Sequence, residues 1–167
     1  MRLAAPEALG ERHAVGEFDC GEASLNDWLK RRAARNQASG ASRCFVAADI
    51  ESRQVGAYYA LASSAITPDR ATGRLRRNMP DPIPVVVLAR LAIDTRCQGQ
   101  GLGRALFQDA ARRVLHAGEA IGIRGLIVHA LSEPARDFYL RLGLEPSPLE
   151  PLTLMTTVAD LRAALGD

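Results

Sequence analysis

The order of apolar and polar positions predicts a chain in which strands and helices alternate. Apolar runs at 44–48 and 54–66 are joined by a short polar turn, which predicts an antiparallel hairpin. Residues 85–93 have the length and β-branched content of a buried central strand, and residues 126–130 form a second such run. Residues 153–157 are expected to form a last short strand.

Helices are predicted where apolar residues recur every three or four positions. The first is expected to begin at Ser24, which together with Asp27 makes a weak capping-box pattern. The apolar spacing over 102–118 predicts an amphipathic helix directly after the central strand. Ser132 is a candidate N-cap for a further helix. The last two expected helices cover 133–142 and 158–165.

The strand, helix and strand between residues 85 and 130 predict a right-handed crossover with two parallel neighbours. The connector 67–84 is rich in proline and is expected to be a loop. The fold class predicted is therefore α/β with a mixed sheet flanked by helices. The length of 167 residues fits one domain, over residues 1–167.

Composition narrows the functional classes. A formal charge of +2 does not by itself imply nucleic-acid binding. Cys20, Cys44 and Cys97 are odd in number and lack metal-ligand spacing, so neither a disulfide framework nor a metal site is expected. No apolar stretch approaches the ~20 residues of a membrane span, and no signal-peptide core is seen at the N-terminus. A cytoplasmic protein without membrane contact is the expectation.

Residues 98–104, here called the glycine loop, place three glycines at alternate positions between the central strand and a helix. A nucleotide-triphosphate P-loop requires a lysine that this loop lacks. A dinucleotide fingerprint starting at Gly99 requires glycine where Arg104 stands. The remaining interpretation is a set of backbone N–H groups at a helix N-terminus, which suits a pyrophosphate.

The segment Gln98 to Gly103 resembles the acetyl-CoA loop of the GCN5-related N-acetyltransferases, which reads Gln/Arg-x-x-Gly-x-Gly/Ala. The resemblance extends over the whole chain and implies a mixed sheet whose two parallel strands splay apart around the pantetheine arm. It implies acetyl-CoA as co-substrate. The residues expected to bind it are Leu91, Ala92, Ile93, Arg96, Gln98, Gly99, Gln100, Gly101, Leu102, Gly103, Arg104 and Ser132.

The same resemblance assigns a catalytic role to Tyr139. Attack of an amine on a thioester produces an oxyanion and then a thiolate, and the thiolate needs an acid. Residues 138–144 are similar to the family's Phe-Tyr-x-x-x-Gly-Phe segment, in which the tyrosine hydroxyl faces the CoA sulfur. The alternative is an ordinary aromatic residue packed in the core. The chain departs from the family where Leu131 and Ser132 replace a frequent asparagine, which leaves Ser132 open as a simple helix cap.

Residues 18–29, 34–37 and 80–94 resemble the acetyltransferase toxins of bacterial toxin–antitoxin pairs. That resemblance implies acetylation of the α-amino group on charged tRNA, which blocks translation, as well as a ribbon-helix-helix antitoxin and a homodimer. An α-amino group, with a pKa near 7.7–8.0, needs little general base. The arginines that become candidates for tRNA phosphates are Arg31, Arg32, Arg35, Arg70, Arg74, Arg76 and Arg77.

Two alternatives remain open. A GCN5-related acetyltransferase acting on a small-molecule or protein amine would share the loop and Tyr139 but would not need the arginines. An inactive acetyl-CoA-binding or partner-binding module would be insensitive to Tyr139→Phe. His129 is interpreted as a packed strand residue, and Asp94 as a residue that caps or braces the glycine loop. The sequence does not specify which aminoacyl-tRNA is acetylated.

Overall fold

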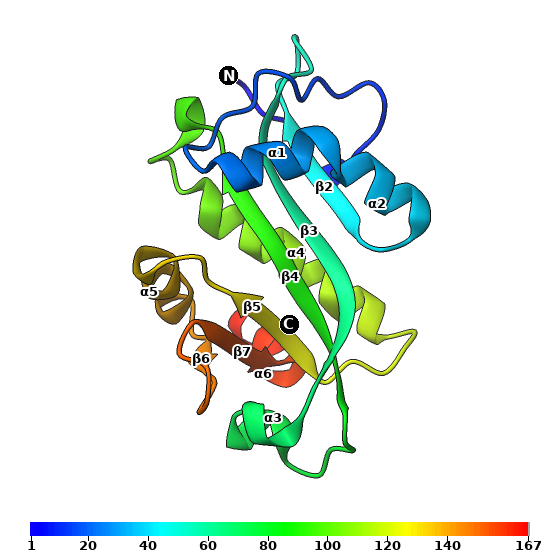
Figure 1. Cartoon of the computed structure of the whole chain (residues 1–167), viewed down its shortest axis with the longest axis vertical. Coiled ribbons are helices and arrows are strands. Elements are labelled where there is room, and N and C mark those ends of the chain that lie inside the picture. The colour runs from blue at the N-terminus through cyan, green and yellow to red at the C-terminus, as the bar shows by residue number, and fades with distance from the viewer. Residues whose placement is uncertain (167) are drawn as a thin grey trace. The chain divides into compact units, whose positions relative to one another are not determined.

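The computed structural model describes residues 1–166 (Figure 1). Seven strands form one mixed sheet in the order β1-β2-β3-β4-β5-β7-β6, with helices beside it, which confirms the predicted fold class. The chain divides into two compact units. The first comprises Met1–Ala62 and Ala89–Ala110, and the second begins with Ser63–Leu88 and resumes at Ala111. β3 (Val55–Ile66), β4 (Ile83–Ile93) and α4 (Leu102–Gly118) each contribute residues to both units.

The first unit contains the predicted hairpin. β2 pairs antiparallel with β3, so that Phe45 lies opposite Tyr59, and β1 pairs with the other edge of β2. Its apolar core gathers Phe18, Trp28 and Tyr58, each at most 5% exposed. Figure 1 shows α1 crossing in front of the strands and α2 lying beside β2. The bounds are β1 Glu7–Ala8, β2 Arg43–Ala48, α1 Ala23–Arg31 and α2 Ala33–Ser39.

The predicted start of the first helix is wrong. α1 begins at Ala23, and the residue at its N-cap is Glu22, which makes no side-chain cap hydrogen bond. The helical pattern also divides in two, because Arg32 takes a φ of −123° between α1 and α2. Burial of Trp28, Leu29 and Ala33 fixes these helices without the expected capping box.

The second unit contains the parallel pair. β4 and β5 are parallel from Val85 opposite Gly125 to Leu88 opposite Val128, as the crossover predicted. β5 pairs on its other side with β7, antiparallel. A Cβ at Gly125 would lie 2.2 Å from the backbone oxygen of Thr156, so only glycine permits this close pairing. The bounds are β5 Gly125–His129, α5 Glu133–Arg141, β6 Glu145–Pro146, β7 Thr153–Thr157 and α6 Val158–Ala164.

The connector 67–84 is not simply a loop. It contains a 3₁₀ turn, η1 (Pro68–Arg70), and a single-turn helix, α3 (Gly73–Arg76). Thr72 caps α3 by accepting a hydrogen bond from the Leu75 N–H, and Leu75 is fully buried. One buried leucine anchors this turn, a packing interaction that the proline and glycine content did not predict.

Among residues 1–166, no helix has the length and apolar character needed to cross a bilayer.

Candidate active site

The glycine loop carries the backbone geometry expected of an anion site. Gly99 and Gly101 have φ values of +79° and +78°, a conformation that side chains with a Cβ rarely adopt. A Cβ on either glycine would meet no atom within 4 Å, so the space beside the backbone is open. Within the described chain, the N–H groups of residues 99–104 donate to no protein atom, and α4 begins among them at Leu102. The loop can therefore hold an anion by backbone donors alone.

Asp94 braces the strand end that leads into this loop, as expected. Its side chain is 1% exposed and accepts hydrogen bonds from the backbone N–H groups of Arg96, at 2.9 Å, and Asp19, at 3.0 Å. The Arg96 guanidinium adds two further bonds, at 2.9 and 3.0 Å. These bonds, those of the guanidinium above all, lower the pKa of Asp94 to about 2. Asp94 is thus an ionised structural anchor and not a general base.

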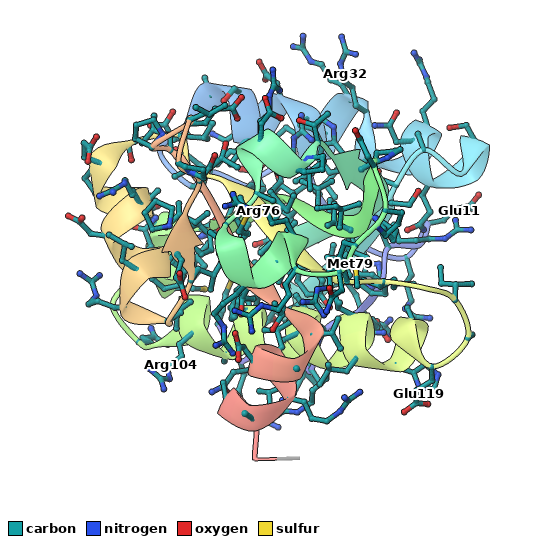
Figure 2. The ribbon with its side chains drawn as sticks, turned by 90° about the horizontal axis from the view of Figure 1, so that it is seen from below. Glu11, Arg32, Arg76, Met79, Arg104 and Glu119 are labelled. Atoms are coloured by element: carbon teal, nitrogen blue, oxygen red, sulfur yellow. The ribbon has the colours of Figure 1, made fainter. Side chains whose placement is uncertain are left out.

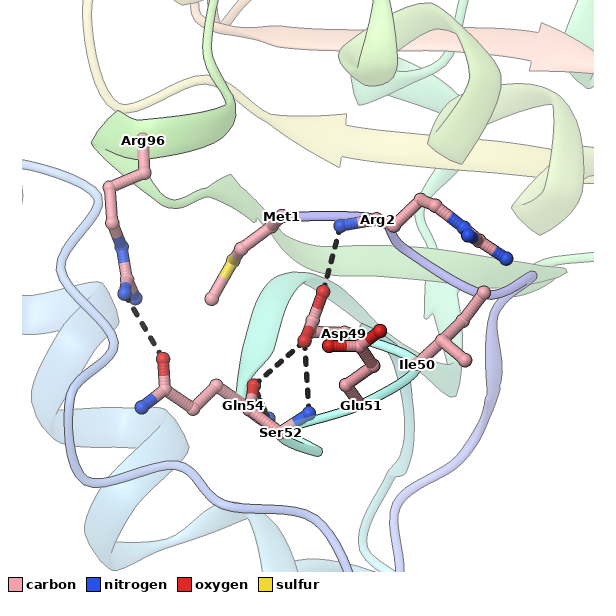
Figure 3. A pocket seen from close by; sticks show the side chains of 8 residues that line it. All are labelled: Met1, Arg2, Asp49, Ile50, Glu51, Ser52, Gln54 and Arg96. Atoms are coloured by element: carbon pink, nitrogen blue, oxygen red, sulfur yellow. Dashed lines mark hydrogen bonds between the residues drawn. The ribbon is translucent and has the colours of Figure 1, made fainter.

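The side chains of Arg96 and Gln98 have hydrogen-bond partners within the protein, and their expected role in binding acetyl-CoA stays a prediction. Besides its bonds to Asp94, Arg96 donates to Gln54 at 3.1 Å, a contact visible in Figure 3. Gln98 donates from its amide nitrogen to the backbone oxygens of Cys20 and Ile93. Arg104 is exposed, and Figure 2 shows it directed away from the ribbon. The loop thus leaves Arg104 and its own backbone N–H groups for a ligand.

The remaining predicted acetyl-CoA residues differ in accessibility. Leu91 and Ile93 are half-buried at the end of β4, whereas Ala92 is buried in the core of the first unit. In the second unit, the Ser132 hydroxyl accepts from the Ala135 N–H at 3.3 Å and caps α5. The presence of serine at position 132 is therefore accounted for by helix capping. Its expected role in binding acetyl-CoA stays a prediction.

Tyr139 lies on α5 and is 8% exposed, with its ring edge-to-face against Phe138 at 5.0 Å between centroids. Burial raises the pKa of Tyr139 well above that of a free phenol. The phenol therefore keeps its proton at neutral pH, which is the state that a general acid requires.

An arginine-lined cavity of about 480 Å³ lies in the first unit, on one side of α1. Arg31 and Arg32, both predicted, line it, and neither forms an ion pair within the described chain. Arg90 lines it as well, with its guanidinium carbon 4.4 Å from the ring centroid of Trp28. Figure 2 shows Arg32 projecting from the ribbon. Arg35 is exposed but does not line the cavity.

Sequence reasoning missed Arg90 as a candidate. The available signal was a charged residue inside an otherwise apolar strand, since burying an arginine requires a partner. Here that partner is the face of Trp28, a cation–π contact that leaves the N–H groups of the guanidinium free for an anion.

The arginines of the connector are largely paired within the second unit. Arg74 forms a two-pronged ion pair with Asp160 at 2.6 and 2.9 Å, and Arg70 lies 3.3 Å from Glu150. Arg76 donates to the backbone oxygen of Ala71. Arg77 is exposed, with no ion pair within residues 1–166. Three of the four connector arginines predicted to contact tRNA therefore have structural partners.

The mixed sheet, the glycine loop and the helix that starts from it define an acetyltransferase of the GNAT class. The family model of the Acetyltransferase (GNAT) domain matches residues 40–146, and the chain belongs to this family.

Within this family, the chain is similar to several proteins that are described as toxins. The tRNA-acetylating toxin of Mycobacterium tuberculosis (strain ATCC 25618 / H37Rv) is 47% identical over 163 residues, covering 98% of this chain and 97% of the relative. The solved structure of AtaT complexed with acetyl-methionyl-tRNAfMet has a TM-score of 0.88 and 32% identity, covering 95% of this chain and 97% of that one. A mutant AtaT toxin bound to the C-terminus of the antitoxin AtaR and acetyl-CoA has a TM-score of 0.82 and 31% identity, covering 98% of each chain.

Proposed function

We propose that this protein transfers the acetyl group of acetyl-CoA to the α-amino group of aminoacyl-tRNA, and so acts as a toxin that blocks translation. The observation that carries the proposal is the 47% identity, over nearly the full length of both chains, to a tRNA-acetylating toxin. Because that identity includes both compact units, we treat residues 1–167 as one functional domain.

Acetyl-CoA supplies the activated acetyl thioester, and the glycine loop fits its pyrophosphate. The unpartnered N–H groups of residues 99–104 and the open space at Gly99 and Gly101 support this fit. The positive end of the α4 dipole adds a favourable interaction with an anion, typically ~0.3–1 kcal/mol. Arg104 is placed next to the same donors in sequence and can add a charge-assisted hydrogen bond.

Tyr139 is the group proposed to protonate the departing thiolate. Its buried phenol holds a proton at the pH of the cell, as its raised pKa requires. Once an amine has attacked the thioester, a thiolate leaves, and proton donation to the sulfur stabilises it. The GNAT resemblance of residues 138–144 supports this proposal, because in that segment of the family the tyrosine hydroxyl faces the CoA sulfur.

The arginine-lined cavity supports a polyanionic substrate. Arg31, Arg32 and Arg90 converge on one cavity, and Asp27 is the only acidic residue among those that line it. Contacts of this kind to phosphates position a nucleic acid without reading its sequence, and they weaken as salt concentration rises. Arg35 and Arg77 extend the set of unpaired arginines.

The remaining proposals concern partners and place of action. A relative in this family is described bound to the C-terminus of an antitoxin, and we propose an antitoxin of ribbon-helix-helix type for this protein too. We further propose that the protein is a homodimer and that it acts in the cytoplasm, where charged tRNA is found.

The test is to incubate the purified protein with isotope-labelled acetyl-CoA and total charged tRNA. After ribonuclease digestion, mass spectrometry identifies any N-acetyl-aminoacyl-adenosine. We expect the label on the α-nitrogen of at least one amino acid, and none on uncharged tRNA. Label on free polyamines or on protein lysines, with none on charged tRNA, would favour the alternative acetyltransferases and contradict the proposal.

A further inference from the structure

The second unit contains a cavity of about 220 Å³. Arg70 is the only predicted site residue among those that line it. Its apolar lining includes Ile66, Val87 and Ile127, which lie on β3, β4 and β5. Its polar lining includes His129, Thr153 and Glu150. Cavities that hold whole drug-sized ligands typically measure ~300–1,000 Å³, so this one suits a single small group.

His129 is exposed at this cavity, which overturns its interpretation as a packed strand residue. It is the last residue of β5 and lies opposite Thr153 of β7. The parallel pairing of β5 with β4 has ended one residue earlier, at Val128. His129 therefore lies one residue beyond the last paired position of β5 with β4.

A chain of hydrogen bonds fixes the tautomer of the neutral imidazole. The Thr153 hydroxyl donates to Glu150 Oε2 at 3.1 Å, because a carboxylate can only accept. Having used its single proton, that hydroxyl must accept from His129 Nδ1, which lies 3.0 Å away. Nδ1 then carries the hydrogen of the neutral ring, and Nε2 carries the lone pair.

Within the described chain, Nε2 of His129 has no hydrogen-bond or ion-pair partner. Glu150 is held in place by Arg70, 3.3 Å away, and these two residues are the other charged groups that line the cavity. The Glu150 carboxylate therefore orients the His129 ring through the Thr153 hydroxyl, which lies between them. This arrangement leaves a basic nitrogen on a residue that lines a partly apolar cavity.

We propose that this cavity receives the aminoacyl end of the substrate, and that His129 Nε2 accepts a hydrogen bond and then one proton from its ammonium group. The proton moves from the substrate nitrogen to Nε2, which leaves a neutral amine and an imidazolium. Thr153 and Glu150 are positioning residues that hold the ring and its tautomer. The inference rests on the proposed function only in taking the amine from aminoacyl-tRNA.

The tautomer is tested directly, without any substrate, by long-range ¹⁵N–¹H NMR of the histidine rings above their titration range. We expect His129 to carry its hydrogen on Nδ1. His13 is an internal control with the opposite expectation, because its Nδ1 accepts from the Gly10 N–H at 2.9 Å and its Nε2 lies 2.8 Å from Glu7. Thr153→Val should remove the tautomer preference of His129 and leave the tautomer of His13 unchanged. Finding the hydrogen on Nε2 of His129 in the wild type would overturn the proposal.

Kinetics test the proton transfer. His129→Asn keeps an amide nitrogen able to donate to Thr153 but removes the basic Nε2. An α-amino group with a pKa near 7.7–8.0 is roughly 9–17% neutral at pH 7, so loss of the proton acceptor can cost at most about 6–11-fold, and we expect kcat/KM at pH 7 to fall by about 5–10-fold. The deficit should shrink towards pH 9, where the substrate amine is neutral without help. His116→Asn, at an exposed histidine on α4, is the matched control and should leave kcat/KM unchanged.

An equal loss at every pH, or no loss, would contradict the role of His129. The melting temperature of His129→Asn should stay within about 2 °C of the wild type, which separates the effect from unfolding. If the wild type acetylates polyamines but not charged tRNA, the proposed function fails and the same comparison is made with the polyamine. If the wild type acetylates no amine, the proposal that Nε2 accepts a proton from the substrate is overturned. The NMR experiment still determines the tautomer of His129 in that case.

Discussion

The arginines first considered for phosphate binding differ in their pairing between the two compact units. In the first, the N–H groups of the glycine loop and the guanidiniums of Arg31 and Arg32 have no partner in the described chain. In the second, Arg70 and Arg74 are paired with carboxylates, and Arg124 donates to two backbone oxygens. Our proposal gives these unpartnered donors of the first unit to phosphates and assigns Tyr139 and His129 of the second unit to the chemistry, whereas Arg70, Arg74 and Arg124 stabilise the second unit itself. The number of arginines in a segment says less about anion binding than their pairing does.

The largest expected effect tests the chemical role of the second unit. Tyr139→Phe removes only the hydroxyl, so we expect kcat to fall about 100-fold or more, while the KM for acetyl-CoA changes less than twofold. Steady-state kinetics with a coupled assay for free CoA measures both values. Tyr58→Phe is the matched control in the first unit, where the hydroxyl donates to the backbone oxygen of Leu25 and serves structure. Unchanged kcat in Tyr139→Phe would contradict the assignment.

A smaller effect tests phosphate binding by the first unit. Gly101→Ala places a Cβ on a backbone held at a φ of +78°, so the loop must change conformation or carry strain of roughly 1–2 kcal/mol. We expect the affinity for acetyl-CoA, measured by calorimetry, to fall by about tenfold or more. Gly73→Ala, where φ is ordinary and the space is open, should leave it unaltered. Equal affinity in the Gly101 variant would show that the loop conformation is not required.

The smallest effect separates the two groups of arginines. Arg32→Gln should raise the KM for charged tRNA several-fold and reduce the slope of log KM against log salt by ~0.7–0.9 for each phosphate that is no longer neutralised. Arg74→Gln should change neither quantity and should lower the melting temperature only slightly, as expected for an exposed ion pair. Kinetics at several salt concentrations and thermal melts measure both variants. If Arg74→Gln changed the salt slope as much as Arg32→Gln, the distinction between paired and unpaired arginines would be wrong.

The sequence predicted those features that depend on local pattern. The hairpin of β2 and β3, the parallel pair of β4 and β5, and α4 all follow from apolar periodicity, and the brace by Asp94 follows from its position at a strand end. The predicted cap of the first helix was wrong because the position of α1 depends on burial of Trp28 and Leu29 and not on the capping propensity of Ser24. β6, two residues long, has too little pattern to detect.

The candidate site was less predictable wherever pairing between distant residues matters. Asp160, the partner of Arg74, lies 86 positions away, so no local spacing could show that this arginine is occupied; Gln54, one of the partners of Arg96, lies 42 positions away. The environment of His129 likewise depends on Thr153 and Glu150, which reach it through strand pairing. The glycine loop was predictable because its conformation and its donors lie within seven consecutive residues.

The most direct measurement is an amide ¹⁵N–¹H NMR titration that follows Gly99, Gly101 and Gly103. Acetyl-CoA should shift all three resonances strongly, because their N–H groups would donate to the pyrophosphate, whereas S-acetyl-pantetheine, which has no pyrophosphate, should leave them nearly unmoved. Shifts of equal size with both compounds, or none with acetyl-CoA, would contradict the claim that backbone donors of this loop hold the acetyl donor.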